Sequence, residues 1–95
     1  MFVRIARFEG GDESAMQRTI DRIKAESGNP PPGLEGTKRI MVLIDRNGGG
    51  GLGMTFFDTE DDLRRGDEAL NAMSPEGDAR RASVEVYEVG LDHQP

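Results

Sequence analysis

Three polar side chains of this sequence, Arg4, Glu85 and Tyr87, have the chemistry of a substrate site, and all three fall in segments typical of strands. A tyrosine hydroxyl donates a hydrogen bond to a substrate oxygen, an arginine holds a carboxylate or an enolate, and a glutamate accepts a proton. The same residues also suit a structural role at a contact between subunits, with the Tyr87 ring packed against its neighbours. We name them as candidate catalytic residues and keep the structural role as the alternative.

The four consecutive glycines Gly48–Gly51 suggest a phosphate-binding loop at first sight. Such a loop needs a Lys-Ser or Lys-Thr pair and must open a helix. Here the glycines precede residues 52–58, which are typical of a strand, and they follow Asn47. Asn-Gly favours a hairpin turn with positive φ angles. We therefore interpret the glycine run as the tip of a β-hairpin and predict no nucleotide site.

The acidic and basic clusters have ordinary explanations. The acidic segment 58–62 lacks the spacing of a calcium loop and suits the first turn of a helix. The single histidine, His93, stands near the C-terminus and does not make a metal site alone. We expect no metal and no cofactor. Arg64-Arg65 and Arg80-Arg81 are expected to be exposed charges, with capture of an anion or a carboxylate as the alternative.

Composition limits the size and the partners of the protein. Its 95 residues make one small domain with a thin core, and 35% of them are hydrophobic, so we expect a homodimer that buries further surface. A net charge of −6 argues against nucleic acid and against an anionic membrane as partners. There is no cysteine, and the longest apolar run, Ile40–Ile44, is too short to cross a membrane. We expect a cytoplasmic protein.

Periodicity along the chain predicts the element order β-α-β-β-α-β. The strands are expected at residues 2–8, 39–45, 52–58 and 82–89. The second helix is expected to begin after Thr59 as its N-cap and to end before Ser74-Pro75. This order predicts a ferredoxin-like α+β sandwich, with two helices on one face of a four-stranded antiparallel sheet. We expect a single domain over residues 1–90 and a polar tail over residues 91–95.

The segment between the first two strands is expected to hold a helix and a loop. The helix is predicted to start near Asp12 or Ser14, with Gln17 completing a capping box, and to end after about four turns at a C-cap, Gly28. Residues 29–37 contain three prolines and two glycines, which exclude regular structure. They are expected to form a connecting loop, with a lid over a pocket as the alternative.

Both faces of the predicted sheet carry apolar side chains. Alternation places one β-branched set under the helices: Val3, Ile5, Ile40, Val42, Ile44, Val84 and Val86. The opposite face is expected to hold Arg4, Glu85 and Tyr87, with Ser83 and Val89 beside an apolar set: Phe2, Ala6, Phe8, Met41, Leu43, Met54 and Phe56. The register of the third strand is open, and Thr55 and Phe57 are the alternative to Met54 and Phe56. An apolar wall with a few polar groups is typical of a pocket, so we predict that two sheets pack through this face and enclose one.

The chain resembles the dimeric α+β barrel superfamily, in particular domains similar to antibiotic-biosynthesis monooxygenases. The strand Ile40–Arg46, the glycine turn, the run Gly51–Leu70 and the strand Val84–Val89 carry this resemblance, which extends over residues 2–90. It implies two ferredoxin-like subunits that form a barrel, with pockets between each sheet and its helices or loops. Members include cofactor-independent oxygenases of polycyclic aromatics, haem-degrading enzymes and many small proteins of unknown role.

The enzymatic members commonly use Trp, Asn and His around the pocket. This sequence has no Trp, so no catalytic residue carries over by position. The leading prediction is a homodimer that binds a small, largely apolar organic molecule between its sheet and the partner, without a clear catalytic set. The alternative is a cofactor-independent monooxygenase of an aromatic or polyketide-like substrate, in which Tyr87 and Arg4 polarise an enol. A third reading is a pure oligomerisation module whose pocket is filled by side chains.

Overall fold

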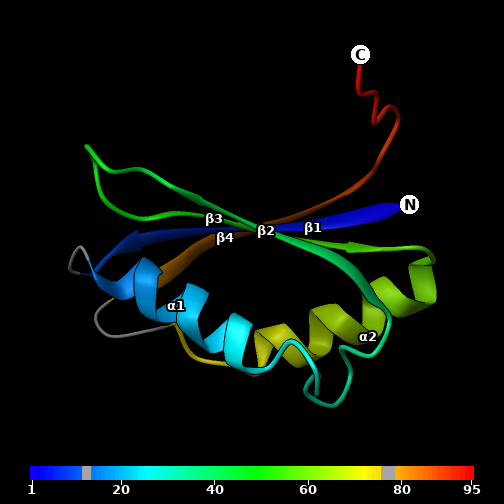
Figure 1. Ribbon diagram of the computed structural model, residues 1–95, viewed down its shortest axis with the longest axis horizontal. Coiled ribbons are helices and arrows are strands. Elements are labelled where there is room, and N and C mark those ends of the chain that lie inside the picture. Colours follow the sequence, from blue (N-terminus) through cyan, green and yellow to red (C-terminus); the bar gives the residue numbers. More distant parts are fainter. Residues whose placement is uncertain (12–13, 76–78) are drawn as a thin grey trace.

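The computed structural model describes residues 1–11, 14–75 and 79–95 of the chain. Its elements are β1 (Phe2–Gly10), α1 (Ser14–Ala25), β2 (Thr37–Ile44), β3 (Gly51–Phe57), α2 (Glu60–Asn71) and β4 (Ala79–Glu88). The strands form one antiparallel sheet in the order β2-β3-β1-β4, and both helices lie on the same side of it (Figure 1). The predicted ferredoxin-like βαββαβ sandwich is confirmed.

The register of the sheet decides which side chains of β1 lie under the helices. Arg4 is opposite Thr55 of β3 and opposite Val86 of β4. Its guanidinium bonds to α2, and residues directly opposite each other share a face, so Arg4 and its partners belong to the helix face. The prediction for β1 was therefore wrong. Val3 and Ile5 lie on the open face, and the helix face carries Phe2, Arg4, Ala6 and Phe8.

The cause of this error lies in the composition of β1. Both of its alternating sets are largely apolar, and each contains one arginine, Arg4 or Arg7, so alternation alone does not distinguish the two faces. The strand is central in the sheet, between β3 and β4, and both of its faces need apolar side chains. What decides the orientation is the pairing of Arg4 with α2, which is distant in sequence.

In β2 and in β4 from Ser83 onward, the orientation is the one that alternation predicts, and the structure decides the register of β3, which the sequence left open. Ile40, Val42 and Ile44 of β2 share the helix face with Thr55 of β3, because Ile40 is opposite Thr55 and the alternation continues from there. Met54 and Phe56 are opposite Met41 and Arg39 and lie on the open face, which settles the register of β3. The open face therefore also carries four further residues of the predicted set: Leu43, Ser83, Glu85 and Tyr87.

The glycine run is the tip of the β2–β3 hairpin, as predicted, but the turn differs from the expected one. Positive φ angles occur at Gly49 and Gly50, and Asn47 does not have one. The Asp45 carboxylate instead accepts the backbone N–H groups of Asn47 and Gly48 at 3.0 and 2.8 Å, which lowers the pKa of Asp45. A Cβ at Gly50 would lie 2.3 Å from the Phe8 carbonyl oxygen, so this position requires glycine.

The two helices differ in how well their ends were predicted. Thr59 caps α2, and its Oγ1 accepts the Asp62 N–H at 3.1 Å. The first helix ends at Ala25 rather than at Gly28, which does not have the positive φ of a C-cap. The expected N-cap Asp12 and the short loop over residues 76–78 lie outside the described residues.

Candidate functional site

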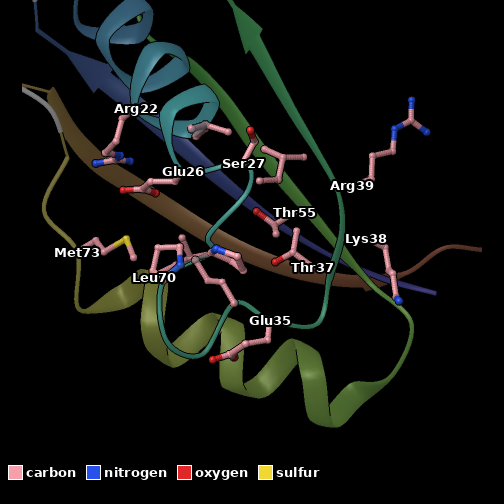
Figure 2. A pocket seen from close by; sticks show the side chains of 15 residues that line it. Arg22, Glu26, Ser27, Glu35, Thr37, Lys38, Arg39, Thr55, Leu70 and Met73 are labelled. Atoms are coloured by element: carbon pink, nitrogen blue, oxygen red, sulfur yellow. The ribbon is translucent and has the colours of Figure 1, made fainter.

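A cavity of about 350 Å³ lies on the helix side of the sheet (Figure 2). Its walls come from the end of α1, the proline-rich segment 29–37, the strands β2 and β3, and the last turn of α2. Seven of its lining residues are apolar: Ile23, Pro30, Pro31, Leu34, Ile40, Leu70 and Met73. The other eight of its 15 lining residues are polar or charged, but apolar atoms make up most of the lining surface, and a volume of this size is in the range of small-molecule sites. The cavity is therefore the candidate functional site.

The proline-rich segment forms one wall of this cavity because turns hold it against α2. The Leu34 N–H donates to the Pro31 carbonyl at 3.0 Å, and the Thr37 N–H donates to the Leu34 carbonyl at 3.1 Å. Gly33 has a φ of 91°, and a Cβ there would lie 2.8 Å from the Ala69 Cβ. The segment thus covers the site, which agrees with the alternative that the sequence left open for it.

Polar groups also line the cavity. Thr37 and Thr55 both line the cavity (Figure 2), and Thr55 is buried. The Glu35 carboxylate accepts the Gly33 N–H, and hydrogen bonds from the Glu35 and Gly33 backbone lower the pKa of Glu35. Arg39 extends away from the cavity and lies over the Phe56 ring at 5.6 Å, on the open face (Figure 2).

A second cavity of about 50 Å³ lies deeper, between α1, β1, β4 and the end of α2. It shares three lining residues with the larger cavity: Arg22, Leu70 and Met73. Two further arginines, Arg4 and Arg81, complete its charged lining. Among the described residues that line this smaller cavity, there are three arginines and no carboxylate.

Arg4 is a buried cation held by α2. Its side chain is 4% exposed, and its Nε donates to the Asp67 carboxylate at 2.8 Å. A second guanidinium nitrogen donates to the Asn71 amide oxygen, also at 2.8 Å. Both partners lie on α2 four residues apart, so they share one face of the helix above Arg4. This pair ties the centre of the sheet to α2.

Arg81 reaches the same region because β4 contains a bulge. Phe8 of β1 is opposite Arg81, whereas Arg7 is opposite Ser83, so Ala82 is the extra residue. A bulge of this kind re-aims the neighbouring side chain. Arg81 therefore lies on the helix face with Phe8, although regular alternation along β4 would place it on the open face with Ser83 and Glu85.

The Arg81 guanidinium closes the C-terminal end of α2. One of its nitrogens donates to the Leu70 and Met73 carbonyl oxygens at 2.9 and 2.8 Å. Its Nε is buried and has no acceptor among the described residues. Burial lowers the pKa of Arg81, repulsion from Arg4 lowers it further, and Asp67 acts in the opposite direction. Arg81 was predicted as an exposed charge, and sequence parity gave no signal of its inward position.

The three candidate catalytic residues do not meet. Arg4 lies on the helix face, whereas Glu85 and Tyr87 lie on the open face of the neighbouring strand, so the sheet separates them. The prediction that they share one face is wrong for Arg4, for the same reason as for Phe2, Ala6 and Phe8. An oxygenase mechanism that uses Tyr87 and Arg4 on one substrate has no site in this structure.

Glu85 and Tyr87 interact with each other on the open face. The Tyr87 hydroxyl donates to the Glu85 carboxylate, and this hydrogen bond raises the pKa of Tyr87, with a further contribution from the negative charge of Glu85. The predicted apolar residues Met41, Leu43, Met54 and Phe56 lie on this face as well. Their role as a dimer face stays a prediction.

Within residues 1–11, 14–75 and 79–95, no group of three or more His, Cys, Asp or Glu side chains is placed to hold a metal ion. No helix among these residues is long and apolar enough to span a membrane.

Among the comparisons with known proteins, only the one with solved structures gives matches. No protein-family model matches the chain, and no curated protein is significantly similar to it. The chain is similar to a crystal structure of an arginine-to-serine mutant of MhuD with two manganese protoporphyrin IX molecules bound per active site. The two chains are 16% identical, the TM-score is 0.62, and the match covers 100% of each chain. At this identity the likeness establishes the fold, a small ferredoxin-like α+β domain.

Proposed function

We propose that this protein binds a small, largely apolar organic molecule in the cavity between its sheet, its helices and the proline-rich segment. The observation that carries the proposal is the cavity itself, with about 350 Å³ of space and seven apolar lining residues. Two threonines in its lining supply hydrogen-bonding groups that orient a ligand. This proposal places the ligand on the helix side, whereas the sequence led us to expect it between the sheet and a partner.

The structural neighbour supports this proposal at the level of the fold. MhuD in the solved structure holds a metalloporphyrin, so a fold of this kind accommodates a flat organic molecule. Ligand binding without a defined reaction is the function that we propose. We further propose that the chain acts in the cytoplasm as a homodimer whose open faces pack together in an α+β barrel.

Blocking the cavity tests the binding proposal. A neutral aromatic probe, 2-naphthamide, is titrated calorimetrically into the protein and into the variant Ile40→Trp. Ile40 lines the cavity and is 45% exposed, so an indole at this position fills the space without disturbing the core. We expect the probe to bind the natural sequence and the variant to bind it at least about tenfold more weakly, which corresponds to about 1.4 kcal/mol.

A matched control comes from the same strand. Leu43 is 42% exposed and lies on the open face, so Leu43→Trp adds the same side chain away from the cavity. We expect this control to bind the probe as the natural sequence does. The proposal fails if the natural sequence does not bind the probe, or if the two variants are weakened equally.

A further inference from the structure

The two helix-side cavities share three lining residues, which suggests one ligand with two parts. Arg22, Leu70 and Met73 border both spaces. The larger cavity is mostly apolar and takes an organic body, while the smaller one, of about 50 Å³, has room for a group of only a few atoms. The chemistry of the smaller cavity therefore identifies the end group of the ligand.

Charge in the smaller cavity favours an anion. Arg4 and Arg81 line it with no carboxylate among the described lining residues, and Arg22, which also lines it, has an interaction partner of its own. Asp67 pairs with Arg4 from outside this lining, through the Arg4 Nε. Arg81 makes its two hydrogen bonds to the neutral carbonyl oxygens of Leu70 and Met73 and has no ion pair among the described residues. A guanidinium in this position is not neutralised by those bonds.

Arg81 also has an unmet hydrogen bond. Its Nε is buried and lacks an acceptor among the described residues, and a buried donor without a partner is costly. The arginine guanidinium binds a carboxylate in a fixed planar geometry. Its hydrogen bonds are stronger when the acceptor is charged. The lowered pKa of Arg81 has burial as its first cause and Arg4 as its second, and an anion nearby would offset both.

We propose that the ligand is an organic acid whose carboxylate enters the smaller cavity and is bound by Arg81 beside Arg4, while its apolar body fills the larger cavity. The proposal rests on the proposed function, since it assigns the end group of the same ligand. The β4 bulge at Ala82 is what delivers Arg81 to this place. Arg81 is then the residue that determines specificity for acids over neutral molecules.

A matched pair of probes tests the proposal separately from the proposed function. The probes are 2-naphthoate and 2-naphthamide, which share the apolar body and differ in charge. We expect the natural sequence to bind 2-naphthoate at least about tenfold more tightly than 2-naphthamide. In Arg81→Gln this preference disappears and the amide binds as before. Arg81→Lys keeps the charge without the planar fork, so it restores part of the preference.

The control is the neighbouring arginine. Arg80 is exposed and pairs with Glu9 at 3.0 Å, so Arg80→Gln removes the same charge at a distance from the cavity and leaves the preference intact. Ile40→Trp must weaken both probes, which places the acid in the same site.

Each result has one meaning. Suppose that 2-naphthamide binds, that Ile40→Trp weakens its binding, and that 2-naphthoate binds no more tightly than 2-naphthamide. The acid proposal is then overturned and the binding proposal stands. Retention of the preference in Arg81→Gln also overturns the acid proposal. If Arg81→Gln does not fold, the affinity ratio of the two probes is compared between the natural sequence and Arg81→Lys. The role of Arg81 is contradicted if the natural sequence shows no preference for 2-naphthoate, or if Arg81→Lys shows an undiminished preference.

Discussion

The two faces of the sheet differ in where they place a charge. The helix face encloses a cation: Arg4 is 3% exposed and is neutralised by Asp67. The open face leaves Leu43 and Tyr87 42% and 51% exposed, although Val3 and Phe56 on the same face are buried. A charge is therefore inside and leucine is outside, because Arg4 has its partners within the chain and the open face has no layer above it. Hydrophobicity alone does not say which face is the core.

Two adjacent phenylalanines give the sharpest comparison of the faces. Phe57 is 0% exposed and packs against Gly66 of α2, whereas Phe56 is 9% exposed and points to the open face. We expect Phe57→Ala to lower the free energy of unfolding by about 3–5 kcal/mol, because it leaves a cavity under the helix. Phe56→Ala should cost less in the monomer, because both helices lie on the other side of the sheet (Figure 1). Urea denaturation of both variants measures the difference, and equal losses would show that the open face contributes as much to the core as the helix face.

The buried ion pair is the next test of the helix face. Asp67→Ala leaves Arg4 with Asn71 as its only side-chain partner among the described residues. The Asp67 side chain is 33% exposed, so solvent screens part of the loss, and we expect about 2 kcal/mol of destabilisation. Asp61→Ala breaks an exposed pair with Arg64 on the same helix and should cost about 0.5 kcal/mol or less. Thermal unfolding measures the loss of stability in both variants. If Asp67→Ala costs as little as Asp61→Ala, the buried Arg4 does not need the Asp67 carboxylate for stability.

Association tests the open face. We expect Leu43→Asp to abolish the homodimer, because it places a charge in the centre of the proposed contact. Ile40→Asp, at a similarly exposed position on the helix face, should leave the dimer intact. Both changes are at exposed sites and should alter monomer stability by only about 0.5 kcal/mol. Sedimentation at micromolar concentration gives the mass, and a monomeric natural sequence would remove the barrel proposal.

The smallest effect is expected at Tyr87. The hydrogen bond to Glu85 and the negative charge of Glu85 raise the pKa of Tyr87 above its ordinary value of about 10. The folded state then holds the phenolic proton more tightly than the unfolded state does. This contribution to stability is complete below the unfolded pKa and is lost as pH rises through the folded pKa.

The measurement is clean because Tyr87 is the only tyrosine of the sequence. Its ultraviolet absorbance reports the phenolate directly. We expect Glu85→Gln to move the midpoint of the titration down toward about 10. A midpoint that is the same with and without the Glu85 carboxylate would show that the two side chains do not interact in solution.

Local signals in the sequence were enough for the fold and for part of the element boundaries. The cap at Thr59 and the hairpin at the glycines both depend on short-range chemistry, and both are present. The end of α1 was predicted too late, because Gly28 is a permissive residue but the helix had already ended at Ala25. Alternation also gave the correct orientation of β2 and most of β4, whereas it left the register of β3 open.

The site was harder to predict because long-range contacts decide it. The orientation of β1 depends on the Arg4–Asp67 pair, which joins positions 63 residues apart. The inward position of Arg81 depends on one extra residue in β4, which alternation cannot reveal. The cavity forms where the proline-rich segment meets α2, and its position follows from tertiary packing rather than from any motif.

The bulge at Ala82 has a consequence for how such a protein diverges. Point substitutions change the character of a site gradually, but the shift in pairing between Ser83 and Arg81 sets the side of the sheet on which a cation stands. If β4 kept Ala82 but paired regularly through it, Arg81 would lie on the outer surface with Ser83 although no residue had changed. Changes in strand register at this bulge, more than substitutions in the cavity, would therefore separate a protein with the proposed acid site from one without it.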